Sequence, residues 1–230
     1  MKYKSALVTA ASGSVNGLCA SHNRGGQYFR ARTIPTNPAT SFQQAVRNLM
    51  STLVAAWSNV LTSTQRQGWA DYADQVEKTD SLGEKRKATA LDWYVACNVP
   101  RLQIGTLVRI DNAPTNFTMA SLTPPTITSI TASTGILILA YTNTDAWATA
   151  VGGALAVYIS RPASAGVSYF KGPYRFLGKV LGAASPPTSP FTSGASPFPM
   201  AAGNKVFVQV RALNSDGRIS APFRLSALAV

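Results

Sequence analysis

Cysteine, histidine, charge and long apolar runs are all scarce in this chain of 230 residues. Its two cysteines, Cys19 and Cys97, are too few for a disulfide scaffold, so we expect free thiols in a protein made in a reducing compartment. The single histidine, His22, has a ligand-like spacing from Cys19. Four nitrogen or sulfur ligands cannot be assembled from three candidates in separate segments, so we expect neither a metal nor a cofactor.

No run of about 18 apolar residues occurs, which excludes an ordinary transmembrane helix. The N-terminus imitates a signal peptide, with Lys2 and Lys4 as a basic start and Cys19 as a lipidation point. The intervening residues contain Ser, Thr, Asn and Gly throughout, and Leu18 stands where a lipoprotein signal needs a small residue. We therefore expect this segment to belong to the mature protein.

Charged residues make up only 13% of the chain, about half the usual share. A surface this poor in charge suits a protein that is mostly covered by partners. The net charge of +12 favours acidic partners, such as nucleic acid, an anionic surface or an acidic protein. Both ends are basic: the first acid is Asp71, and residues 121–230 hold eight basic residues against two acids.

The pattern along the chain predicts a multi-part α+β protein. Residues 1–36 form an extended basic arm, in which two β-type runs flank the turn signal HNRGG as a hairpin. Residues 37–109 form a helical region of three helices, and residues 110–125 form a proline-punctuated linker. Residues 126–230 form a small antiparallel β-sandwich, because their apolar pattern has period two and Gly, Pro and Asn/Asp clusters separate the runs.

Within the helical region, Asn37 before Pro38 predicts the start of the first helix. Thr62 or Ser63 is expected to cap the second helix, and Thr89 with Asp92 resembles a capping box at the third. Pro100 is expected to kink or end that helix. One apolar face is predicted on the first helix; it comprises Phe42, Val46, Leu49, Leu53, Ala56, Trp57 and Val60.

Six strands are expected in the sandwich, with a tight turn at Asp216-Gly217 before the last one. The proline-rich stretch 182–200 cannot form a central strand and is expected to be a long loop. The strand candidates are residues 127–133, 136–142, 154–161, 174–181, 205–213 and 223–230.

Two stretches carry resemblances. KVFVQVRALNSDGRISAP, residues 205–222, resembles the last hairpin of fibronectin type III and Ig-like modules. RGGQYFRAR and PTNPATSFQQAVR, followed by Trp57, Trp69 and Tyr72 on paired helices, resemble uncharacterised proteins encoded among phage and prophage structural genes. The second resemblance covers roughly residues 1–110 and implies a virion component rather than a mechanism.

Catalytic signals are weak, and we expect no enzyme. Gly25-Gly26-Gln27 matches the tripeptide of class-1 peptide release factors, but nothing around it resembles the rest of such a factor. A nucleophilic triad would have to use His22, which has no acid nearby in sequence. No phosphate-binding glycine motif occurs. A turn of two glycines with basic neighbours explains this segment without catalysis.

Five residues are the candidate partner contacts: Arg24, Tyr28, Arg30, Arg32 and Trp147. In a strand, residues 28, 30 and 32 point to one face, where arginine and an aromatic ring can grip phosphates or pair with a neighbour's carboxylates. We favour protein contacts. Trp147 lies in a loop of the sandwich, where an exposed tryptophan would indicate a contact point.

We therefore expect a bacteriophage virion structural protein, capsid-associated as a minor capsid or decoration (cement) protein, made in the host cytoplasm. Its partners would be other virion proteins, in a homo-oligomeric or multi-copy arrangement, with no membrane. One alternative is a nucleic-acid-binding protein that holds packaged genome with its basic arm. A tail, connector or fibre position is a close variant, and a carbohydrate- or host-surface-binding module is a third hypothesis resting on fold analogy.

Overall fold

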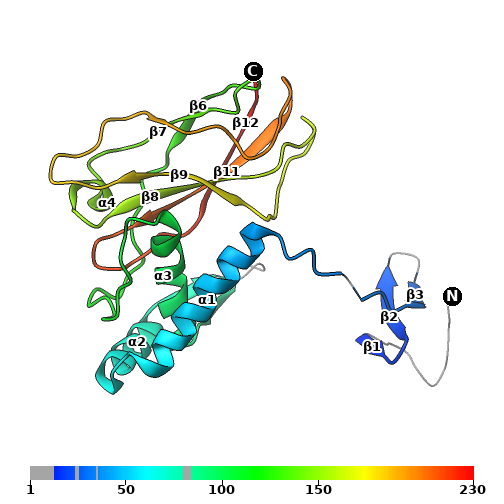
Figure 1. Ribbon diagram of the computed structural model, residues 1–230, viewed down its shortest axis with the longest axis horizontal. Helices are drawn as coiled ribbons and strands as arrows, with labels where there is room; N and C mark the ends of the chain where they lie inside the picture. Colours follow the sequence, from blue (N-terminus) through cyan, green and yellow to red (C-terminus); the bar gives the residue numbers. More distant parts are fainter. Residues whose placement is uncertain (1–12, 24–25, 35, 80–83) are drawn as a thin grey trace. The chain divides into compact units, whose positions relative to one another are not determined.

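A computed structural model describes residues 13–23, 26–34, 36–79 and 84–230 (Figure 1). By its internal contacts the chain divides into two compact units, residues 1–44 and 45–230. None of the helices in the described ranges is long and apolar enough to cross a membrane.

The first unit contains a three-stranded antiparallel sheet in the order β1-β2-β3. Its strands are β1 (Gly13–Val15), β2 (Leu18–Asn23) and β3 (Gly26–Ala31). The β2–β3 hairpin confirms the predicted pairing, although Arg24 and Gly25 at its turn lie outside the described residues. The additional strand β1 turns into β2 at Asn16-Gly17, where Asn16 takes a φ of 51° that this residue tolerates well.

Helix α1 (Ser41–Asn59) has its first four residues in the first unit and the rest in the second. Helix α2 (Ser63–Gln75) comes next, and α3 (Ala90–Ile104) follows a short ribbon. The predicted start of α1 at Asn37-Pro38 is wrong. Thr40 accepts the amide of Gln43 at 3.4 Å, and the Gln43 side chain accepts the amide of Thr40 at 3.3 Å, so this reciprocal cap starts the helix later. The predicted cap of α2 is Thr62, and the predicted box at Thr89 with Asp92 is confirmed.

Pro100 does not end α3, which continues to Ile104. The last turn is held from outside the helix, because the Lys179 ammonium donates to the Ile104 carbonyl at 2.7 Å. The Arg101 guanidinium also donates to the Val108 carbonyl at 3.2 Å and to the Asn214 carbonyl at 3.0 Å. These tertiary bonds outweigh the local preference of proline to break the helix.

The ribbon between α2 and α3 was not predicted. Strand β4 (Glu77–Thr79) pairs with β5 (Lys85–Lys87), and both are rich in charge. Charged residues on a two-stranded ribbon give no period-two apolar signal, so the pattern indicated a polar loop.

All six predicted strands of the C-terminal region are present, and a short strand in the proline-rich stretch joins them at a sheet edge. They form two antiparallel sheets, in the orders β10-β7-β6 and β12-β11-β8-β9. The strands are β6 (Thr126–Ile130), β7 (Leu137–Ala140), β8 (Ala154–Ile159), β9 (Arg175–Leu181), β10 (Phe191–Thr192), β11 (Lys205–Leu213) and β12 (Phe223–Leu228).

Two apolar cores stabilise the second unit. One lies between the sheets and includes Leu139, Val157 and Val208. The other joins the helices to the opposite face of the four-stranded sheet, where Trp69 and Trp93 belong to the same cluster as Ala156. The mixed α+β architecture is as expected. The helices and the four-stranded sheet pack into one core, so the segment 110–125 does not separate two independent bodies.

The expectation that Trp147 is an exposed contact residue is wrong. The short helix α4 (Ala146–Thr149) places its ring at 0% exposure in the core between the sheets, beside Tyr141. Its indole N–H donates to Asp145 at 3.3 Å. The polar residues around Trp147 in the sequence indicated a surface loop, but the Trp147 ring fills the end of this core.

Candidate functional site

The sheet of the first unit carries a basic face. Tyr28 and Arg30 lie two residues apart on β3, so their side chains point to the same side of the sheet. Arg30 is exposed and Tyr28 is half-buried. Arg32 follows the strand, is exposed, and donates its backbone amide to the Gly17 carbonyl at 2.9 Å. Three of the expected contact residues therefore lie within one short segment, whereas Arg24 lies outside the described residues.

Cys19 sits between two polar neighbours on this sheet. The strand registers place it directly opposite Ser14 on one side and Arg30 on the other. Hydrogen bonding by Ser14 first, and then by Arg30, lowers the pKa of the Cys19 thiol, with a further electrostatic contribution from Arg32. A basic neighbourhood of this kind favours an anion at the position of the thiol.

Helix α1 presents an apolar line to solvent. Phe42, Val46, Met50 and Val54 follow one another at four-residue spacing, and each side chain is between 41% and 53% exposed. Residues three and four apart lie on one face of a helix, so these side chains form a continuous row. We call these four residues the α1 stripe. The apolar face predicted from the sequence includes Phe42 and Val46 but not Met50 or Val54.

A different side of α1 attaches the helix to the rest of the second unit. Leu53 and Ala56 are its buried residues, and the Trp57 ring lies 5.4 Å from the Tyr94 ring of α3. Residues 41–48 are exposed throughout. The first half of α1 therefore extends from an anchored second half, and its apolar side chains face water.

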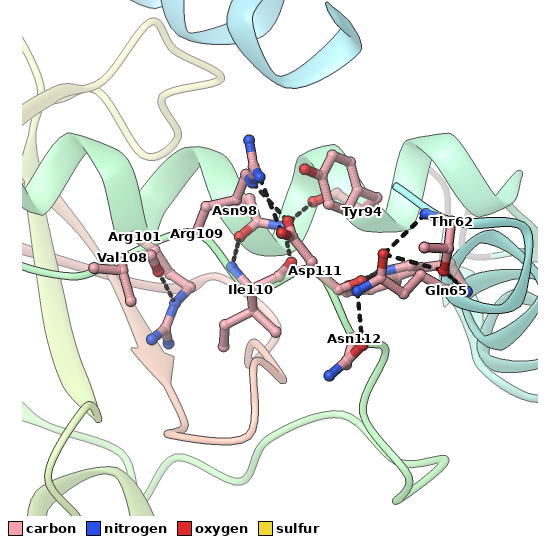
Figure 2. Close-up of polar contacts among 11 residues, drawn as sticks. Thr62, Gln65, Tyr94, Asn98, Arg101, Val108, Arg109, Ile110, Asp111 and Asn112 are labelled. Atoms are coloured by element: carbon pink, nitrogen blue, oxygen red, sulfur yellow. Dashed lines mark hydrogen bonds and ion pairs between the residues drawn. The ribbon is translucent and has the colours of Figure 1, made fainter. Parts of the chain in front are cut away.

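Hydrogen bonds fix residues 108–112 against α2 and α3 (Figure 2). The fully buried Asn98 accepts the amide of Ile110 at 2.8 Å and donates to the carbonyl of the same residue at 3.0 Å. Arg109 and Asp111 form a two-bond ion pair at 2.6 and 2.9 Å. The Trp69 indole donates to the Asp111 carbonyl at 2.8 Å.

In the part of the chain that the structure describes, no group of three His, Cys, Asp or Glu side chains is placed to hold a metal ion. Cys97 is 1% exposed, and burial raises the pKa of its thiol to about 12. At neutral pH this thiol therefore stays protonated, and Cys97 packs like a small apolar side chain. Two surface features could contact another molecule: the basic face and the α1 stripe.

Comparison with known proteins finds no matching family model, no matching curated protein and no matching solved structure.

Proposed function

We propose that this chain is a structural protein of a tailed-bacteriophage virion, associated with the capsid as a minor capsid or decoration protein and acting through protein–protein contacts. The α1 stripe carries the proposal. A row of four exposed apolar side chains on one helix is a typical surface for another protein, because covering it removes apolar area from water. The phage class comes from the resemblance of residues 1–110, and a tail or connector position belongs to the same proposal.

The strand order supports an Ig-like or fibronectin type III-like sandwich as part of this proposal. Three antiparallel pairs of consecutive strands each lie within a single sheet: β6–β7, β8–β9 and β11–β12. The other connections, from β7 to β8, from β9 to β10 and from β10 to β11, pass between the sheets. Such alternation is typical of Greek-key sandwiches, which serve as bracing or projecting modules in many extracellular and surface assemblies.

The basic face supports a second candidate, genome binding. Arg30 and Arg32 are exposed next to Tyr28, and the sequence contains no acid before Asp71. Phosphate contacts from such a segment would weaken steeply as salt rises, whereas burial of the α1 stripe would tolerate salt.

Light scattering after size exclusion, at low and high salt and with or without duplex DNA, tests both candidates. We expect a multi-copy assembly that persists at high salt and ignores DNA. The double variant Val46→Glu with Met50→Glu should dissociate it, because two carboxylates in an apolar contact would be desolvated without partners. The control Ala55→Glu changes an exposed residue of the same helix outside the stripe and should leave the assembly intact.

The melting temperature of the double variant should stay close to that of the unmodified chain, because both side chains already face solvent. An assembly that survives the double substitution would remove the α1 stripe from the contact. A monomer that binds DNA at low salt and releases it at high salt would instead favour genome binding.

A further inference from the structure

A groove of about 420 Å³ lies between the helices and the outer face of the four-stranded sheet. Its wall is mostly apolar and aromatic, and includes Met50 of α1, Val95 and Val99 of α3, and Tyr158 of β8. Arg211 of β11 also lines it. A volume of this size falls within the range of ligand-binding sites, and the apolar wall would accept apolar side chains.

Arg211 is an unusual residue for such a wall. It lies directly opposite Ala156 of β8 and two residues from Gln209 on the same face of the sheet. Its Nε is sealed from solvent and has no hydrogen-bond partner in the described parts of the chain. Burial also lowers the pKa of the guanidinium. A buried donor on a cation normally has an acceptor, so this position lacks one.

This chain does not supply the missing acceptor from its described residues, since no carboxylate is among the groove's lining residues. Seven of its acids have partners elsewhere. Hydrogen bonds or ion pairs join Asp71 to Gln67, Asp74 to Lys87, Glu77 to Lys85, Asp92 to Thr89, Asp111 to Arg109, Asp145 to Thr123 and Asp216 to Arg218.

We propose that the groove binds an acidic residue on an apolar segment of a partner protein, with Arg211 as the counter-ion of the carboxylate. A guanidinium matches a carboxylate in shape and can bind both oxygens. The apolar wall would hold the residues on either side of the acid. This inference rests on the proposed function, because Met50 belongs both to the groove and to the α1 stripe. A partner that covers the stripe therefore reaches the groove.

A partner protein fits the groove better than a second copy or a nucleic acid does. Seven acids of a second copy would have to leave the contacts that they make within their own chain. Nucleic acids are held through rows of phosphates by several exposed cations, whereas this groove presents Arg211 and Lys171 among mostly apolar lining residues. A partly buried guanidinium with one exposed ammonium in the same apolar groove matches a single acid on an apolar segment.

The test selects peptides from a displayed random dodecapeptide library on the purified full chain. We expect a consensus with one Asp or Glu between apolar residues. A synthetic peptide of that consensus should bind at least about tenfold more tightly than its Glu→Gln or Asp→Asn counterpart, because the buried guanidinium needs the charge. Arg211→Gln should abolish that difference. Arg224→Gln, which removes one cation from the same sheet face but outside the groove, should preserve it.

Melting temperatures of the same variants separate binding from folding. Arg211→Met should melt at or above the temperature of the unmodified chain, because the substitution removes a buried donor without a partner. A selection without an acidic consensus, a Glu-to-Gln change without effect, or peptide displacement by duplex DNA that depends on Arg211 would each overturn the proposal. A clear drop in melting temperature would also overturn it, because Arg211 would then serve the fold.

The outcomes separate this inference from the proposed function. If acidic peptides bind while the α1 stripe variants change no assembly, the groove stands and the proposed assembly contact fails. If the stripe variants dissolve the assembly while no acidic peptide is selected, the assembly contact stands and the groove fails.

Discussion

The two thiols of this chain differ because of their immediate neighbours. Cys97 is a core residue of α3, and burial raises the pKa of its thiol. Cys19 lies across from Ser14 and Arg30 on a small sheet, and their hydrogen bonds lower the pKa of its thiol. The sequence predicted two free thiols but not the difference between their pKa values. A pKa depends on neighbours that the fold brings together.

Alkylation rates should therefore differ strongly between the two cysteines. With iodoacetamide and peptide mass mapping, Cys19 should react fast and with a pH midpoint below that of an ordinary thiol, while Cys97 should stay unmodified in the native protein. The sign follows from the thiolate, which reacts and which persists to lower pH when the pKa is lowered. Arg30→Gln should raise the midpoint more than Arg32→Gln does, because only Arg30 also forms a hydrogen bond. Equal midpoints in all three proteins would refute the assigned cause.

At the scale of elements, the capping boxes show local and tertiary contacts acting together. Thr62 accepts the amide of Gln65 at 3.2 Å, and the Gln65 side chain accepts the amide of Thr62 at 2.9 Å. The same Gln65 side chain donates to Asn112 at 3.0 Å, so the start of α2 also holds the segment that crosses it (Figure 2). The sequence predicted a cap at Thr62 or Ser63, but neither the reciprocal bond from Gln65 nor the link to Asn112.

Thr62→Ala should lower the free energy of unfolding by about 1 kcal/mol, since it removes the side-chain acceptor at the helix start. Urea denaturation followed by circular dichroism measures this change. Thr64→Ala replaces a nearby exposed threonine within the helix and should change stability by less than about 0.5 kcal/mol. Equal losses for the two variants would mean that the cap contributes nothing specific.

For the second unit as a whole, one core reaches across the helices and the four-stranded sheet. Trp69, Trp93 and Ala156 belong to that core, while Trp147 belongs to the core between the sheets. The four-stranded sheet contributes one face to each core, as the alternation along β11 requires. Residues 45–230 should therefore unfold together.

Fluorine NMR of the protein labelled with 5-fluorotryptophan tests this coupling. The four tryptophan signals, assigned by single Trp→Phe substitutions, should lose native intensity at the same urea concentration, because neither core persists without the sheet between them. Retention of the Trp147 signal where the Trp93 signal is gone would show that the helical and sheet parts unfold independently.

Much of the secondary structure was present in the sequence. Period-two runs predicted all six longer strands of the C-terminal region, and Thr62 or Ser63 and the pair Thr89 with Asp92 marked two helix starts. These signals are local, so they are readable without knowledge of the fold. The charged ribbon β4–β5 was missed because it has no period-two apolar pattern. The start of α1 was misplaced because Asn37-Pro38 resembles a helix start.

Sequence patterns alone predicted the three long helices and the six longer strands of the C-terminal region, the basic charge and an apolar face on α1. Which apolar groups are covered depends on the tertiary structure. It buries Trp147, leaves the α1 stripe exposed, and seals the Nε of Arg211 in a groove without an acceptor among the described residues. The physical reason is that periodicity marks the apolar side of an element, whereas burial depends on what other elements place against that side.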